Sequence, residues 1–303
     1  MVEPIDGFVE ANGIRLHHLK WMAGGHELPP LVLVHATGFL ARLWQPVADL
    51  LTARFTVHAF DIRGHGDSDK PVEMPGEDPL APDTESFAGD YHWQNLVDDL
   101  AALLDVLSLT GVPIAGHSSG GATAAYLAAT RPEYVSSLVL IEPIIIPSQI
   151  AVEDNQKSRM ADGARKRRQV WASVGEMIAA YRTRPTFEHW RDDVLRLYAE
   201  EGTYRRDDGQ IALKCPGEIE AQVFENSASL DVWDVLPRVD CPTAVMKGAW
   251  TERFLSMMAT GAAERIPGAR LVAIANAGHL APMERPESVA DEIMTFLSGG
   301  TGG

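Results

Sequence analysis

The chain has 303 residues, 46% of them hydrophobic, and a formal net charge of −16. This length allows one large domain, or one domain with an insertion, whose core needs no disulfides. The negative charge argues against nucleic acid and anionic membranes as partners. With only two cysteines, no signal-peptide pattern and no apolar run of about 20 residues, we expect a reduced, cytoplasmic protein without a membrane anchor.

The first half of the chain alternates unbroken apolar runs with helical patterns. The runs are rich in β-branched residues, which is typical of strands buried on both faces of a mostly parallel sheet. Helical patterns occupy 93–109, where leucines recur on one face, and 119–130. This alternation predicts βαβ units with right-handed crossovers. The strand-like runs are 31–36, 56–62, 112–117 and 137–143.

The alternation stops after about residue 147. The following segment is helical, charged and aromatic, without a strong strand pattern, and Ser173 and Glu176 have the spacing of a capping box. Strand patterns resume at 243–249 and 270–279. We therefore predict an α/β core interrupted by a helical cap. The predicted parts are 1–147 (first part of the core), 148–232 (cap), 233–298 (second part of the core) and 299–303 (flexible tail).

The segment GHSSGG places Ser118 between Gly116 and Gly120, after a predicted strand and before a predicted helix. A sharp strand-to-helix turn crowds the residues two before and two after it, so glycine is favoured at both positions. The residue at the turn is strained, and its side chain projects above the sheet. G-x-S-x-G in this setting predicts a nucleophile elbow, with a glycine-rich turn of no chemical role as the alternative.

The helix after the elbow directs its N-terminal N–H groups at the charge that forms when a serine attacks a carbonyl. The backbone N–H of Ser119 is therefore the predicted first donor of an oxyanion hole. The second donor should come from the loop HATGF, which follows the strand at 31–36. We predict the backbone N–H of Thr37 for this role.

A serine nucleophile needs a general base. Among ten histidines, His279 lies in the loop just past the last predicted strand, at the carboxyl edge of the sheet where the elbow also lies. His17 and His18 are adjacent on a predicted edge strand and so point to opposite faces, unlike paired metal ligands. We predict no metal site. The histidines interpreted as structural are His35, His58, His65 and His117.

The histidine needs a carboxylate that fixes its tautomer and stabilises the imidazolium. Two glutamates compete, Glu142 at the end of the strand SLVLIEP and Glu252 in the loop after TAVMKGA. Glu252 lies in a polar segment, where a solvated charge is the simpler interpretation. Glu142 ends an apolar run and would be half-buried, and a buried carboxylate without a partner is costly. We favour Glu142, with Glu252 as the alternative acid.

These motifs together resemble the α/β-hydrolase superfamily in its capped form. HATGF, DIRGHGDSDKP (61–71), GHSSGG and GHLAPMERPE have the family's order and spacing over nearly all of residues 8–298 except the cap. The resemblance implies an α/β-hydrolase fold with a mostly parallel central sheet and an inserted helical cap. Ala36 departs from the usual glycine of the oxyanion loop.

The position of the acid is a second departure. The family's acid usually follows the strand represented here by TAVMKGA, whereas haloalkane dehalogenases and zearalenone-type lactonases resemble the Glu142 arrangement. The serine nucleophile argues against dehalogenase and epoxide hydrolase activity, which in this family use aspartate.

The leading hypothesis is a serine hydrolase that cleaves a carboxylic ester or lactone through a Ser-His-Glu triad and an acyl-enzyme, without a cofactor. We expect a small, apolar, neutral substrate, for which Trp171 and Trp190 of the cap could line the pocket or serve only packing. A homodimer is left open. Alternatives on the same triad are a C–C bond hydrolase and a hydroxynitrile lyase, and a different class is a small-molecule receptor with slow or no turnover.

Overall fold

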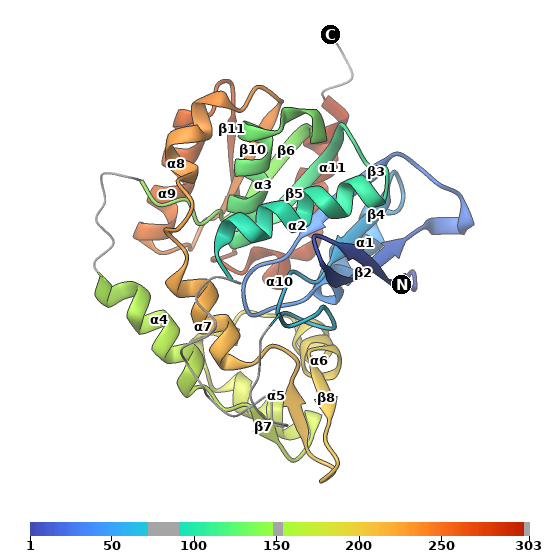
Figure 1. Cartoon of the computed structure of the whole chain (residues 1–303), viewed down its shortest axis with the longest axis vertical. Coiled ribbons are helices and arrows are strands. Elements are labelled where there is room, and N and C mark those ends of the chain that lie inside the picture. Colours follow the sequence, from blue (N-terminus) through green and yellow to red (C-terminus); the bar gives the residue numbers. More distant parts are fainter. Residues whose placement is uncertain (72–90, 148–153, 300–303) are drawn as a thin grey trace.

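The computed structural model describes residues 1–71, 91–147 and 154–299. Its centre is an eight-stranded sheet with the order β1-β2-β4-β3-β5-β6-β10-β11 (Figure 1). Strands β1 and β2 run antiparallel to their neighbours, and the strands from β4 to β11 are parallel to one another. The prediction of a mostly parallel sheet is thereby confirmed. The strands are β1 (Ile5–Ala11), β2 (Ile14–Trp21), β3 (Pro30–Val34), β4 (Thr56–Phe60), β5 (Val112–His117), β6 (Val135–Ile141), β10 (Thr243–Gly248) and β11 (Arg270–Ile274).

Helices cover both faces of the sheet because successive apolar residues of its strands point to opposite sides. Val32 and Ile114 belong to the cluster that packs under α2, α3, α8 and α9. Leu33 and Ala115 belong to the cluster on the other face, under α1, α10 and α11. The helices are α1 (Gln45–Leu51), α2 (Trp93–Val106), α3 (Ser119–Thr130), α8 (Val232–Val235), α9 (Arg253–Arg265), α10 (Ala281–Glu284) and α11 (Pro286–Gly299). Short 3-10 helices are η1 (Ala23–Gly25), η2 (Ala41–Trp44), η3 (Pro132–Tyr134), η4 (Pro185–Phe187) and η5 (Leu236–Arg238).

The strand order reverses at β3. From β3 the chain moves to β4 on one side and later to β5 on the other, so the loops after β3 and β5 leave the same edge of the sheet side by side. Ligands bind at such a reversal in open α/β sheets. Thr37 follows β3 and Ser118 follows β5.

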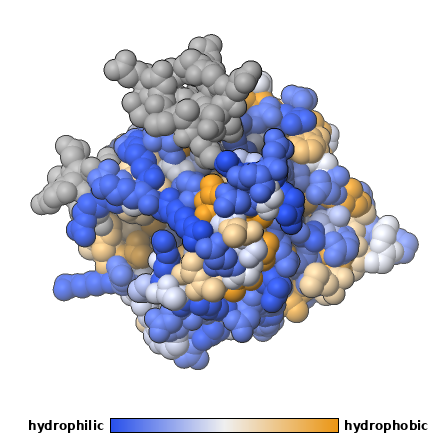
Figure 2. Space-filling view, turned by 90° about the horizontal axis from the view of Figure 1, so that it is seen from below, coloured by the Kyte–Doolittle hydropathy of each residue, from blue (hydrophilic) through white to orange (hydrophobic). Residues whose placement is uncertain are grey.

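A second layer lies across the carboxyl edge of the sheet and is formed by elements between β6 and β10 (Figure 1). It packs on the core through a cluster in which Trp171 and Trp190 of this layer meet Leu40 and Leu280 of the core. Seen from the end of the molecule that this layer forms, the surface is mostly hydrophilic, with smaller apolar areas in between (Figure 2). The elements are α4 (Asp154–Lys166), β7 (Val170–Trp171), α5 (Val174–Arg182), α6 (Asp192–Glu201), β8 (Thr203–Arg205), β9 (Ile211–Leu213) and α7 (Gly217–Glu225).

Two sequence expectations need correction. The segment predicted to be a helical cap, without a strong strand pattern, also contains a three-stranded antiparallel sheet, β7-β9-β8, whose strands are too short to give a periodic pattern. The strand with His17 and His18 is not at the edge, because β1 pairs with its outer side. The predicted helix start at Ser173 is confirmed, since its Oγ accepts the N–H of Glu176 at 3.2 Å.

Some predicted boundaries lie outside the described residues. These are the first six residues of the predicted cap, 148–153, and residues 300–303 of the predicted tail. Among the helices that the structure describes, none is both long and apolar enough to cross a membrane.

Candidate active site

Ser118 occupies a sharp turn between β5 and α3. Its backbone has φ 56° and ψ −116°, a conformation that costs energy for any residue other than glycine. A Cβ atom on Gly116 would lie 2.3 Å from the carbonyl oxygen of Gly120, and one on Gly120 would lie 2.5 Å from that of Val34. The turn therefore requires glycine at both positions, and it holds the Ser118 side chain at the carboxyl edge of the sheet.

The structure brings together the three side chains that the sequence singles out. His279, in the loop after β11, has Nε2 3.2 Å from Ser118 Oγ and Nδ1 3.2 Å from Glu142 Oε2. Both distances are within the reach of a proton transfer. The carboxylate side chain is 1% exposed, whereas the imidazole is 25% exposed. The arrangement joins a hydroxyl, a base open to the surface and a buried acid in one chain of hydrogen bonds.

Glu142 directly follows β6, and the carboxylate oxygen that does not face His279 is also held by hydrogen bonds. Its Oε1 accepts the backbone N–H of Gly248 at 2.6 Å and the hydroxyl of Thr251. Its own backbone has φ 49°, in the left-handed region. Hydrogen bonds from three groups thus surround the buried carboxyl group, which offsets the cost of its burial.

Glu252, the alternative acid, lies in a different environment. It is exposed and precedes α9 at the helix N-cap position. Of the two glutamates, Glu142 is the one hydrogen-bonded to His279. The neighbouring Thr251 reaches Glu142, so the loop after β10 supports the carboxylate after β6.

The loop after β3 is fixed from several sides. The backbone N–H of Thr37, the predicted second oxyanion donor, is 2.9 Å from Ser119 Oγ and donates to it. The next N–H, of Gly38, donates to His65 Nε2 at 2.9 Å, and His35 Nε2 accepts the N–H of Ile62 at 3.0 Å. His35 and His65 thus tie the loops after β3 and β4 together, in line with their structural interpretation.

Several supporting contacts were missed by sequence reasoning. His117 is fully buried, and its Nε2 donates to the carbonyl oxygen of His279 at 2.8 Å. Burial and the neighbouring His279 lower the pKa of His117 to about 3, so its ring is neutral. Buried Glu284 accepts the N–H of Gly278 at 2.6 Å. The only signal in the sequence was the position of His117 next to the nucleophile, since the other contacts depend on how distant loops meet.

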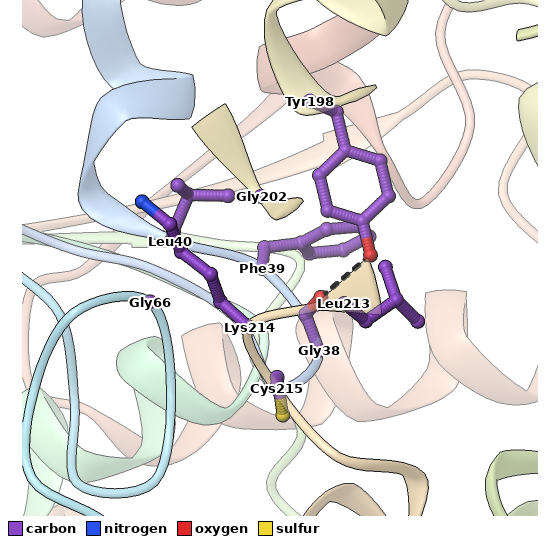
Figure 3. Close-up of a pocket in the computed structure, with 9 residues that line it drawn as sticks. All are labelled: Gly38, Phe39, Leu40, Gly66, Tyr198, Gly202, Leu213, Lys214 and Cys215. Atoms are coloured by element: carbon purple, nitrogen blue, oxygen red, sulfur yellow. Dashed lines mark hydrogen bonds between the residues drawn. The ribbon is translucent and has the colours of Figure 1, made fainter. Parts of the chain in front are cut away.

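The two tryptophans proposed to line a substrate pocket are buried. Trp171 is 1% and Trp190 3% exposed, and both belong to the cluster that joins the second layer to the core. A small pocket nearby brings residues of both layers together, and Tyr198 there donates its hydroxyl to the carbonyl oxygen of Gly38 at 3.1 Å (Figure 3). Burial raises the pKa of Cys215, also in its wall, to about 12, so this thiol is not a nucleophile at neutral pH.

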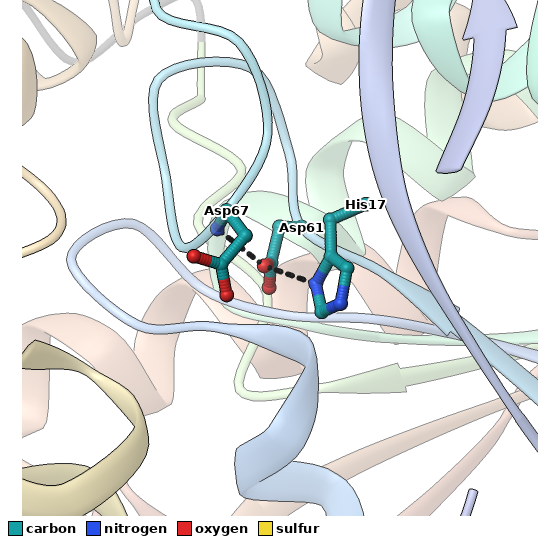
Figure 4. A group of neighbouring side chains, drawn as sticks. All are labelled: His17, Asp61 and Asp67. Atoms are coloured by element: carbon teal, nitrogen blue, oxygen red, sulfur yellow. Dashed lines mark hydrogen bonds and ion pairs between the residues drawn. The ribbon is translucent and has the colours of Figure 1, made fainter. Parts of the chain in front are cut away.

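Apart from this site, His17, Asp61 and Asp67 place potential metal-ligand atoms within 4.8 Å of one another (Figure 4). Asp61 accepts His17 Nδ1 at 2.8 Å, the N–H of Asp67 at 2.9 Å and the N–H of Ala41 at 2.6 Å. The other ring nitrogen of His17 is 3.1 Å from Asp6. These bonds already engage both oxygens of Asp61 and both nitrogens of His17, so we interpret the group as a structural clamp on the loop after β4.

Comparisons with known proteins show the family and the fold of this chain. The model of the alpha/beta hydrolase family matches residues 31–292. The 2-(acetamidomethylene)succinate hydrolase of Mesorhizobium japonicum is 26% identical over 272 residues, which are 89% of this chain and 88% of that protein. N-formylmaleamate deformylase of Pseudomonas putida is 26% identical over 282 residues, 92% of this chain and 91% of the relative.

Solved structures show the same fold. The crystal structure of E-2-(acetamidomethylene)succinate hydrolase superposes with a TM-score of 0.81 at 21% identity and covers 98% of this chain and 100% of its own. The enol-lactonase of Burkholderia xenovorans gives a TM-score of 0.71 at 22% identity, over 96% and 100%. The α/β-hydrolase fold expected from the motifs is confirmed. Because the family model matches the chain from β3 to α11, the chain belongs to the alpha/beta hydrolase family.

Proposed function

We propose that the chain is a serine hydrolase that cleaves a carboxylic ester or lactone, with Ser118 as nucleophile, His279 as general base and Glu142 as the acid. The observation that supports this most directly is the continuous hydrogen-bond chain Ser118–His279–Glu142, with 3.2 Å at each step. The strained elbow adds to it, because unfavourable backbone geometry persists mainly where function requires it.

The proposed reaction uses this geometry. His279 Nε2 takes the proton of Ser118 Oγ while that oxygen attacks the carbonyl carbon, and Glu142 stabilises the imidazolium. The N–H of Ser119, at the N-terminus of α3, faces the developing oxyanion together with the positive end of the helix dipole. His279 returns the proton to the leaving oxygen, which gives an acyl-enzyme. It then activates water to release the acid.

An amide-type bond is the second candidate. Two relatives that match about nine-tenths of the chain are named for an acetamidomethylene compound and for a formylated amide. The same attack by Ser118 would start that reaction. The difference lies in the leaving group, a nitrogen that must receive the proton from His279 before it departs. The bond and the substrate are therefore to be tested together.

The test uses a fluorophosphonate probe and a panel of substrates. We expect the probe to modify Ser118 in wild type and not in Ser118→Ala, with the modified peptide located by mass spectrometry. Ser136→Ala, which removes an exposed serine on β6, serves as control and should react as wild type does. An unmodified Ser118 in the folded wild-type protein would contradict the proposal.

The panel contains short esters, ring lactones and acylated amides, each in a neutral and a carboxylate-bearing version. Steady turnover that Ser118→Ala reduces by at least about 10⁴-fold supports a hydrolase. Ester or lactone turnover well above that of matched amides supports the first candidate, and the reverse order supports the second. A single modification without turnover, or only a ligand-dependent rise in melting temperature, supports a receptor instead.

A further inference from the structure

The side chain of Ser119 lies between the elbow and the loop after β3. Ser119 is the first residue of α3 and is 3% exposed. Its Oγ is 2.9 Å from the backbone nitrogen of Thr37 and 2.9 Å from Thr37 Oγ1, and both groups donate to it. Residue 37 is thus joined by two hydrogen bonds to the residue that follows the nucleophile, 82 positions further along the chain.

These bonds affect which groups can donate hydrogen bonds to an oxyanion. An N–H carries a single hydrogen, and that of Thr37 is directed at Ser119 Oγ. The expected second donor therefore has a protein acceptor before any substrate arrives. The Thr37 amide can therefore stabilise a developing negative charge in one of two ways. It polarises the Ser119 hydroxyl, or that hydroxyl first moves away and frees the amide.

The hydroxyl itself has a proton to give. Its two lone pairs accept the two bonds from Thr37, and among the residues that the structure describes the Ser119 Oγ proton has no protein acceptor. A hydroxyl that accepts two hydrogen bonds is polarised and becomes a stronger donor. In a buried site, such a donor stabilises charge more than it would in water.

The position of Ser119 on its helix also fits this role. In an α-helix the Cα–Cβ bonds tilt toward the N-terminus, which here is the end that carries Ser118. The side chain of Ser119 is therefore inclined toward the elbow, on the same end of α3 as its own backbone N–H. One residue thus presents two donors near the reacting carbonyl.

We propose that the Ser119 hydroxyl is a catalytic hydrogen-bond donor of the oxyanion hole, held and polarised by the backbone N–H and the hydroxyl of Thr37. This inference rests on the proposed serine hydrolase function and deepens it. Ser119 then donates to the oxyanion twice, once through its backbone and once through its side chain. Thr37 acts through Ser119 as a positioning residue.

The test compares Ser119→Ala with wild type in two assays, the second-order rate of fluorophosphonate labelling at Ser118 and the steady-state hydrolysis of the best substrate. We expect Ser119→Ala to lower both the labelling rate and kcat by about 10- to 100-fold, within the range for loss of one oxyanion donor, with KM changed less than about threefold. A trifluoromethyl ketone, which forms an oxyanion on Ser118, should bind more weakly by the same factor, and the carboxylic acid product should not.

Two further variants separate this role from a structural one. Thr37→Val removes the Oγ1 donor and keeps the amide, so we expect a smaller loss in kcat in the same direction. Thr123→Ala removes another buried hydroxyl of α3, which donates to the Ser119 carbonyl oxygen at 3.0 Å, and should leave kcat unchanged. Equal losses in Ser119→Ala and Thr123→Ala would show a packing effect and overturn the proposal.

An unchanged or faster Ser119→Ala enzyme would also overturn it, because the hydroxyl would then only obstruct the Thr37 amide. The outcome is distinguishable from failure of the proposed function. If wild type is not labelled at Ser118, the serine hydrolase itself is wrong. If wild type is labelled and Ser119→Ala reacts at the same rate, only the role of the hydroxyl is wrong.

Discussion

Two regions of the molecule hold a histidine against a buried carboxylate, and they differ in what faces the other ring nitrogen. At the carboxyl edge of the sheet, His279 Nδ1 is 3.2 Å from Glu142, and Nε2 faces the hydroxyl of Ser118. Between β2 and the end of β4, His17 Nδ1 is 2.8 Å from Asp61, and Nε2 faces a second carboxylate, that of Asp6. The side chains of Glu142 and Asp61 are each 1% exposed, whereas the imidazole is 25% exposed in His279 and 8% exposed in His17.

This difference separates the proposed base, His279, from the structural clamp at His17. Burial alone would lower the pKa of His17, but the hydrogen bonds and charges of Asp61 and Asp6 outweigh it and raise that pKa. Because carboxylates engage both ring nitrogens of His17, neither nitrogen is left to accept a proton from a nucleophile. A histidine–carboxylate pair therefore indicates catalysis only when the second nitrogen is left to a hydroxyl and to an incoming substrate.

The largest effect is expected at the acid of the candidate active site. Glu142→Gln keeps the shape of the side chain but removes the charge that orients and stabilises protonated His279. We expect kcat to fall by about 10³- to 10⁴-fold while the protein stays folded, measured by steady-state kinetics and circular dichroism. Glu252→Gln is the matched control and should retain kcat within about twofold. A large loss in the control instead would assign the acid to the loop after β10.

Replacing the carboxylate by an amide in the His17–Asp61 pair should affect stability instead of catalysis. Asp61→Asn breaks the pair with His17 and weakens the two hydrogen bonds that Asp61 accepts from the N–H groups of Ala41 and Asp67. We expect the free energy of unfolding to fall by about 3 kcal/mol in urea titrations, as for other buried pairs that lose one partner. Turnover per folded molecule should stay within a few-fold of wild type. Glu27→Gln, at an exposed ion pair with Lys20, should leave stability unchanged.

Acid should destabilise the protein through its buried neutral histidines. Burial lowers the pKa of His18 to about 4 and that of His58, His65 and His117 to about 3. The unfolded chain, with pKa values near 6.5, binds more protons between about pH 3 and pH 6.5, so stability falls as pH falls through this window. The loss is up to about 1.4 kcal/mol per pH unit for each such histidine.

Urea titrations at pH 8, 6.5 and 5.5 measure this slope. His17 works in the opposite direction, because a raised pKa gives stability that is present below pH 6.5 and lost as pH rises through the folded value. His17→Asn should therefore steepen the decline from pH 8 to pH 5.5. A stability that is flat or rises toward pH 5.5 in wild type would be inconsistent with neutral buried histidines.

The smallest effect is expected where the two layers meet at the surface. Lys214, after β9, pairs with Asp67 in the loop after β4 at 2.6 Å. Because the carboxylate is 41% exposed, water screens the pair. We expect Lys214→Met to lower the free energy of unfolding by less than about 1 kcal/mol, with most of the difference absent in 1 M salt. Scanning calorimetry at low and high salt would detect a larger coupling between the layers if there is one.

Local patterns were sufficient to predict the core. The run at 112–117 coincides with β5, and the two glycines around Ser118 specify a turn that leaves no room for a Cβ atom. The second layer was predicted less well, since strands of two or three residues have no period to detect. The contact of Thr37 with Ser119 and that of Glu142 with Thr251 depend on which loops meet in space, and a sequence pattern cannot specify that.

The order in which the reacting groups occur along the chain has a consequence for biosynthesis. Residues 118 and 142 leave the ribosome long before residue 279, which follows the last strand of the sheet. In the proposed mechanism, a nascent polypeptide that ends before residue 279 therefore contains the serine but lacks the base that activates it. Turnover by the proposed triad would thus report that β11 has added to the sheet, and an assay of activity during synthesis would time that final step.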